Sequence, residues 1–174
     1  EIEAEASTLD GVMALDNVDL RNVRAIEGVR VNNYKQRHLS AAFAGGVTTH
    51  VVQPMTPTLI RGQSGAYRTG VDVITDLIIQ DVVGLEITLG HSAKGGLAKS
   101  ISSQMNILRK TFQTAASSIT ANRSVSSDPV VMALNKEIPV VVHSHNPDEI
   151  ALFIRAVQQP FGLKMIVYGG AEAH

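Results

Sequence analysis

The sequence contains no cysteine, no excess of one charge and no long apolar run. Without cysteine there is no disulfide framework, no thiolate nucleophile and no Cys-ligated zinc. The 15 Lys and Arg residues nearly balance the 16 Asp and Glu residues, so the chain lacks the basic footprint that binds nucleic acid or an anionic membrane surface. Its apolar runs fall far below the roughly 18 to 20 residues that span a bilayer. These absences predict no membrane segment in this chain and favour a small molecule or a protein as its partner.

The 174 residues, 44% of them hydrophobic, are enough for one globular domain with a substantial core. Residues 1–33 mix short apolar pieces with Gly and Asn, and we expect them to form an irregular N-terminal segment. Residues 34–174 should form the folded domain. Patterning there predicts helix 34–44, strand 47–54, loop 55–70, an apolar stretch ending in strand 85–90, helix 97–112, a polar connection 113–127, helix 129–136, strand 138–144, helix 147–161 and strand 163–168. This alternation indicates an α/β fold around a parallel sheet.

Two helix starts and one loop give the sharpest local signals. Asp128-Pro129 and Asn146-Pro147 each pair a capping residue with Pro at the first helical position. Residues 55–70 combine Pro, Ser and three glycines, and long loops of this composition often carry function. We therefore expect Gly62 and Gln63 in this loop to bind substrate.

Histidines gather after the predicted strands. His91, His143, His145 and His174 all follow strand patterns, and ligands of α/β sheets collect at the carboxyl ends of the strands. If the extended backbone continues to Asn146, His143 and His145 point the same way and can chelate a divalent ion. The alternative is ordinary, because a single His at a strand end is more often a hydrogen-bonded surface or capping residue. We expect His91 and His174 to contact the substrate.

Other motif interpretations are weaker. Lys94 precedes Gly95-Gly96, where it is either solvated or meets a phosphate at a helix start. The segment "GHSAKGG" does not have the P-loop pattern, and "GQSG" has neither the dinucleotide-binding spacing nor the G-x-S-x-G pattern. The sequence therefore predicts neither a nucleotide site nor a serine hydrolase.

Three segments in order carry a more specific resemblance: "FAGGVTTHVVQPMTPTLIRGQSGAYRTG", "LEITLGHSAK" and "IPVVVHSHNPDEIALFIRAVQQPFGLKMIVYGGAEAH". Over residues 38–174 the chain resembles the amidohydrolase superfamily, nearest to imidazolonepropionase-like and N-acetylglucosamine-6-phosphate-deacetylase-like members. The resemblance implies an α/β fold that is part of a metal-dependent (β/α)8 TIM-type barrel, incomplete as given. It also implies hydrolysis of C–N bonds other than peptide bonds, in cyclic-amide or N-acyl substrates, by metal-activated water.

The same resemblance implies the site residues. Lys94 matches the Lys or Glu ligand that follows the family's fourth strand, and it would have to be carboxylated because an ammonium group cannot ligate. His143 matches the histidine of the fifth strand, with His145 close behind. The resemblance thus makes Lys94 and His143 catalytic and Lys94, His143 and His145 ligands of one or two divalent ions, zinc foremost, with manganese or iron as alternatives. Such an ion lowers the pKa of bound water to about 7.

Departures from the family pattern leave other functions open. The H-x-H of the first barrel strand and the Asp of the last are absent, and Gly169 stands where relatives carry a sixth-strand histidine. The chain therefore looks like the middle portion of a barrel, which we expect to need a complementing segment or a homo-oligomer. One alternative is a catalytically degenerate barrel that binds ligands or serves as a scaffold, and another is an oligomerising fragment recognised by a partner protein.

Overall fold

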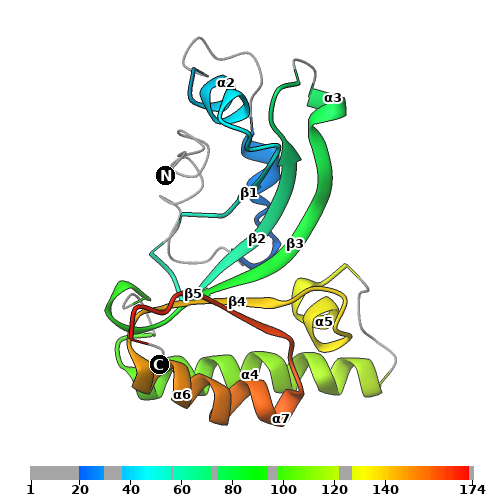
Figure 1. Ribbon diagram of the computed structural model, residues 1–174. Helices are drawn as coiled ribbons and strands as arrows, with labels where there is room; N and C mark the ends of the chain where they lie inside the picture. The colour runs from blue at the N-terminus through cyan, green and yellow to red at the C-terminus, as the bar shows by residue number, and fades with distance from the viewer. Residues whose placement is uncertain are drawn as a thin grey trace.

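In the computed structural model, the residues described are 20–29, 37–55, 57–71, 74–93, 98–121 and 127–172. Their five strands form one curled sheet in the order β1-β2-β3-β4-β5 (Figure 1). The strands are β1 (Thr49–Val52), β2 (Ile60–Arg68), β3 (Ile78–Thr88), β4 (Val140–Ser144) and β5 (Met165–Gly169). β1 to β3 pair antiparallel, whereas β3, β4 and β5 pair parallel. The α/β class is confirmed, but the prediction of a wholly parallel sheet is wrong.

The predicted loop 55–70 is wrong, because strand β2 occupies most of it. The glycines of β2 allow close packing and do not form a turn. A Cβ on Gly65 would lie 2.7 Å from the Cβ of Ile26, and one on Gly62 would lie 2.6 Å from the carbonyl oxygen of Val23. Glycine inside a strand marks a bulge or a close approach of another segment, and β2 indeed shifts register against β3 between Ile60 and Gly62.

The four predicted helices are present with different ends, α4 continuing into the predicted connection 113–127, and short helices that were not predicted are added. All the helices are η1 (Leu20–Asn22), η2 (Ala25–Gly28), α2 (Arg37–Ala44), α3 (Ile74–Leu77), η3 (Gly90–Ala93), α4 (Ile101–Thr120), α5 (Pro129–Leu134), α6 (Pro147–Phe153), the π-helical η4 (Ile154–Gln158) and α7 (Gln159–Phe161). Both predicted caps are confirmed: the Asp128 carboxylate accepts from the Val130 N–H at 2.9 Å, and the Asn146 side chain accepts from the Asp148 N–H at 2.8 Å. None of the helices built from described residues has the length and apolar character to cross a membrane.

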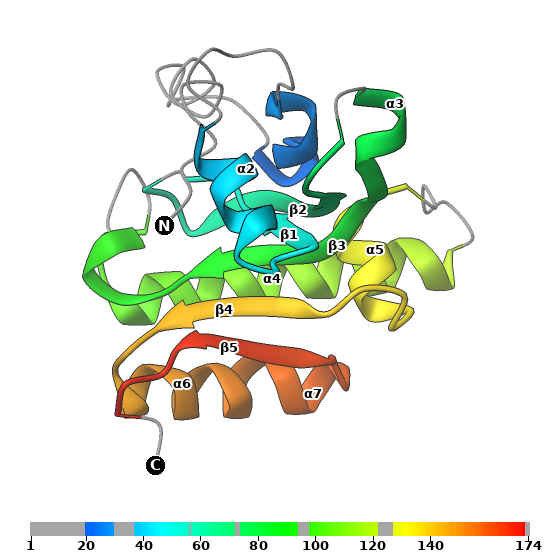
Figure 2. The same ribbon diagram turned by 45° about the horizontal axis from the view of Figure 1, so that its top comes forward.

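Apolar side chains form two separate cores. The larger lies between the parallel strands and the helices α4 to α7, which share one side of the sheet (Figures 1 and 2); Phe112 and Phe153 are fully buried there. The smaller joins β1, β2, η2 and α3 through Ile26, Tyr67 and Leu77. β1 was expected to be a buried strand, yet only Val52 of its four residues is buried, because β1 lies at the edge of the sheet.

The parallel strands bring three chain segments to one end of the sheet. Thr88 pairs with His143 in the β3–β4 register, and His143 pairs with Tyr168 in the β4–β5 register. Their carboxyl ends therefore lie side by side, at the left of Figure 1. Ligands of parallel α/β sheets collect at this end, so the candidate site is sought there.

Candidate functional site

The charged residues of the site lie on what we call the inner face, the face of β3 to β5 turned away from α4. Side chains alternate along a strand. Leu85 and Val142 enter the core with α4, so Glu86 and His143, one position on, point to the inner face. Glu86 is nevertheless fully buried.

His143 is the centre of a four-residue cluster, the His143 cluster, formed by Arg61, Glu86, His143 and Tyr168. Its Nε2 lies 2.6 Å from Oε2 of Glu86, and its Nδ1 lies 3.2 Å from Nη1 of Arg61. The Tyr168 ring packs against the imidazole with centroids 4.6 Å apart and planes tilted by 39°. Both ring nitrogens and one ring face of His143 are thus engaged by residues from β2, β3 and β5.

These partners fix the tautomer of His143. A guanidinium has only donors, so Nδ1 must accept a hydrogen bond from Arg61 and cannot carry a proton. The neutral ring then carries its proton on Nε2, which donates to the Glu86 carboxylate. His143 therefore lies between the Arg61 guanidinium and the Glu86 carboxylate.

Glu86 has an unused acceptor. Among the described residues, neither its Oε1 nor the Oγ1 of Thr88, two positions further along β3, finds a hydrogen-bond partner, although both atoms are buried. Buried polar atoms without a partner are rare and are explained by strain, by a catalytic role or by a bound water or ion. Burial lowers the pKa of Arg61 from its usual value, and the Glu86 carboxylate opposes this shift. The inner face thus presents an anionic oxygen that lacks a partner in the described part of the chain.

The sequence-predicted residues are only partly brought together. Lys94 and His174 lie outside the described residues. His91 is exposed in η3, and His145 is exposed just after β4, which ends at Ser144. The His145 ring lies over Gly169, where a Cβ would stand 2.7 Å from Cε1. His143 and His145 therefore have different neighbours, and their joint binding of an ion stays a prediction.

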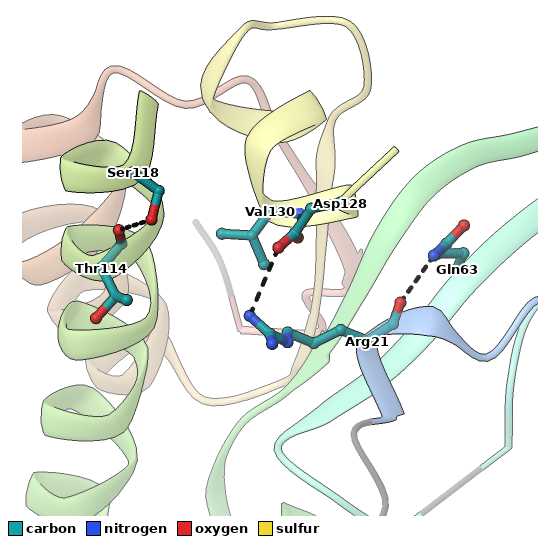
Figure 3. A network of polar contacts seen from close by, with 6 residues as sticks. All are labelled: Arg21, Gln63, Thr114, Ser118, Asp128 and Val130. Carbon is teal, nitrogen blue, oxygen red and sulfur yellow. Dashed lines mark hydrogen bonds and ion pairs between the residues drawn. The ribbon is translucent and has the colours of Figure 1, made fainter. Parts of the chain in front are cut away.

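Gly62 and Gln63 connect β2 to η1. Gly62 has φ +129°, and the Val23 carbonyl occupies the space of a side chain there. The Gln63 amide is buried and donates to the Arg21 carbonyl at 2.9 Å, while the Arg21 guanidinium lies 3.9 Å from the Asp128 carboxylate (Figure 3). These contacts explain why Gly and Gln occupy positions 62 and 63. The role of the two residues in binding substrate stays a prediction.

The turn after β3 is fixed by two buried contacts. The Gln104 side chain accepts from the Gly90 N–H at 3.0 Å and donates to the Gly90 carbonyl at 2.9 Å. The Glu149 carboxylate lies where a Gly90 side chain would stand, and it accepts from the Ser144 hydroxyl at 2.7 Å. Through Glu149, the turn after β3 contacts the end of β4.

Sequence reasoning missed Arg61 and Glu86. Arg61 was placed in a loop, so nothing indicated that it faces β4. Glu86 had a usable signal, since it is the lone acidic residue in the apolar strand "LEITL", and a buried charge is retained only where it is paired.

Glu86 and His143 have the donor chemistry of a metal site. Carboxylate and imidazole are ordinary zinc ligands, and the unpartnered Oε1 is an acceptor in the right place. Within the described ranges, however, no three His, Asp or Glu side chains gather closely enough to hold an ion. Two residues do not make a metal site by themselves, so metal binding here stays a prediction.

The comparison with solved structures supports the fold. The sequence matches no family profile and no curated protein. The structure is similar to that of an amidohydrolase from Thermotoga maritima MSB8, with a TM-score of 0.79 and 24% sequence identity over 94% of this chain. This chain spans 46% of that protein's length. The chain thus has a mixed α/β fold with a curled five-stranded sheet that is compatible with part of a barrel.

Proposed function

We propose that this chain is the middle portion of an amidohydrolase-type hydrolase that cleaves C–N bonds other than peptide bonds, in cyclic-amide or N-acyl substrates. The observation that carries the proposal is the buried Glu86 carboxylate 2.6 Å from His143 at the carboxyl ends of parallel strands. Likeness of the fold to a protein named amidohydrolase supports the general class, and the sequence resemblance supplies the substrate class.

A divalent ion, zinc foremost, belongs to this proposal. Lys94, His143 and His145, the ligands of the sequence prediction, would hold it, with His143 binding the ion only after one ring nitrogen has lost its present hydrogen bond. When bound, such an ion supplies a water of lowered pKa and polarises the scissile carbonyl. Glu86 holds the imidazole of His143 through the Nε2 proton, and Tyr168 packs against the ring and limits its rotation. Burial of Glu86 strengthens its electrostatic effect on a bound substrate.

Turnover and metal content test the proposal together. We expect natively purified protein to hydrolyse members of a panel of N-acyl and cyclic-amide compounds and to contain zinc, manganese or iron. His143→Ala should lower turnover by about a hundredfold or more, the range for losing a directly acting group. Asn135→Ala, an exposed change at the end of α5, is the control and should keep full activity. Protein free of these metals and inactive on the whole panel would contradict the proposal.

A degenerate barrel that binds without catalysis is the second candidate. The Arg61 guanidinium on Nδ1 of His143 favours it, because a fixed cation there could replace an ion permanently. In that case small amides should bind, as seen by calorimetry, without hydrolysis. Turnover that is lost in His143→Ala would remove this candidate.

A further inference from the structure

We infer that Tyr168 is a specificity-determining residue, whose ring offers a flat apolar surface to an uncharged planar ring of the substrate. The inference rests on the proposed function, since it states which substrates of the proposed class the site prefers. It assigns a role to an aromatic residue that no sequence motif indicated. The observation that carries it is a tyrosine ring that packs against His143 at the strand ends and is nevertheless 50% exposed.

Tyr168 lies on the inner face, at the carboxyl end of β5. Met165, three positions earlier, packs against the core that contains α4. Side chains alternate along a strand, so Tyr168 points to the opposite side of the sheet. In the β4–β5 register it is the partner of His143. Because ligands of parallel sheets collect at this end, Tyr168 stands where the substrate is expected to bind.

The Tyr168 ring is held on one side and open on the other. Its centroid lies 4.6 Å from that of the His143 ring, and this contact limits the rotation of the tyrosine side chain. β5 is the last strand of the sheet, and within the described part of the chain no strand covers Tyr168 from beyond β5. Ile166, on the same face, is also 50% exposed. The two side chains therefore form an open apolar surface beside the His143 cluster, and its ring is oriented before a ligand binds.

The charges next to this surface favour an uncharged ligand. Glu86 and Tyr168 both act to raise the pKa of the Arg61 guanidinium, so the cation of Arg61 lies near the buried carboxylate of Glu86 and near the tyrosine. A charged group of a ligand is attracted by one of these two residues and repelled by the other. An uncharged ring is opposed by neither of them.

The aromatic character of Tyr168 distinguishes planar from saturated ligands. Two aromatic systems gain from offset-stacked or edge-to-face contact in addition to the apolar area that they bury, which corresponds to about two- to tenfold in affinity. A saturated ring of the same size gains only from the burial of its surface. A planar cyclic amide should therefore bind here more tightly than its saturated counterpart.

A matched pair of cyclic amides tests the inference on the full chain. α-Pyridone is planar, δ-valerolactam is its saturated counterpart, and both are uncharged. NMR titration measures both affinities. We expect the wild type to bind α-pyridone about two- to tenfold more tightly than δ-valerolactam, and the pyridone protons to shift upfield through the ring current of Tyr168.

Three variants separate the aromatic ring from other causes of binding. Tyr168→Leu should lose both the preference and the upfield shift. Tyr168→Phe keeps the ring and should retain both. Leu152→Ala, at an exposed position on α6, is the control for loss of an exposed apolar side chain and should also retain both.

Each contrary result overturns the role of Tyr168. These results are equal affinity of the wild type for the two lactams, binding of neither lactam, a preference that persists in Tyr168→Leu, and a preference that is lost in Tyr168→Phe. All four leave the proposed hydrolase standing, because turnover on the substrate panel and metal content test that proposal separately. Loss of pyridone binding in Tyr168→Leu with binding kept in Tyr168→Phe supports the inference.

Discussion

At the residue scale, the hydrogen-bond partners of a side chain in this molecule cannot be predicted from its neighbours in the sequence. The sequence predicted His143 to be a metal ligand, which stays a prediction; the structure adds that Arg61 contacts one of its ring nitrogens and Glu86 the other. A histidine's chemistry depends on which nitrogen carries the proton. The partners of His143 therefore determine what it can do more than its position in the chain does.

Gly62 offers a residue-scale test of the close packing between β2 and η1. Gly62→Ala should lower the free energy of unfolding by about 2 kcal/mol or more, because it combines an unfavourable positive φ with a clash. The Cβ would lie 2.6 Å from the Val23 carbonyl oxygen and 3.0 Å from that of Leu20. Urea unfolding of both proteins measures the difference.

Gly46 provides the matched control for Gly62. It also has positive φ, at +92°, but nothing lies within 4 Å of its Cβ position. Gly46→Ala should cost only the backbone strain of about 1 kcal/mol. Equal losses of unfolding free energy in Gly62→Ala and Gly46→Ala would show that Gly62 is not closely packed against η1.

At the scale of elements, the helix starts were predictable and the strand count was not. Asn146 and Asp128 cap their helices as the sequence indicated, because a cap is a local interaction between residues two or three apart. β2 was missed because its glycines are read locally as turn residues. Glycine is needed there because Leu20, Val23 and Ile26, which lie 39 or more positions earlier in the chain, approach Gly62 and Gly65 closely.

The Asn146 cap gives the element-scale prediction. Its side chain accepts from the N–H groups of Asp148 and Glu149, so Asn146→Ala should lower the free energy of unfolding by about 1 kcal/mol. Asn135→Ala, at an exposed site whose amide donates to the Glu137 carboxylate, should cost less than about 0.5 kcal/mol. Thermal or urea unfolding measures both variants. Similar losses of unfolding free energy would show that the Asn146 cap does not stabilise α6.

At the scale of the whole molecule, the sheet ends in an uncovered strand. β5 is an edge strand whose Ile166, Val167 and Tyr168 are 50%, 39% and 50% exposed. Within the described part of the chain, side chains on both of its faces are exposed and no strand pairs with its outer side. Unprotected apolar edge strands promote pairing with another chain.

Self-association through β5 is the prediction at this scale. The wild-type chain should show a sedimentation coefficient that rises with protein concentration, and Val167→Lys should shift it toward the monomer by placing a charge on the edge. Leu152→Lys, on exposed α6 with 42% exposure, offers no strand edge and should behave like the wild type. An unchanged concentration dependence in Val167→Lys would place the association elsewhere.

The sequence by itself determined the α/β class, the two Pro-marked helix starts, the buried strand β4 and the position of His143 at its end. Periodicity, capping and strand alternation are local effects that a short stretch of chain expresses without its neighbours. The tertiary structure alone decided that β2 is a strand, that the sheet is mixed, and that Arg61 and Glu86 meet His143. Those contacts join residues 57 and 82 positions apart, and no local pattern encodes such pairings, because they depend on how the strands register within the sheet.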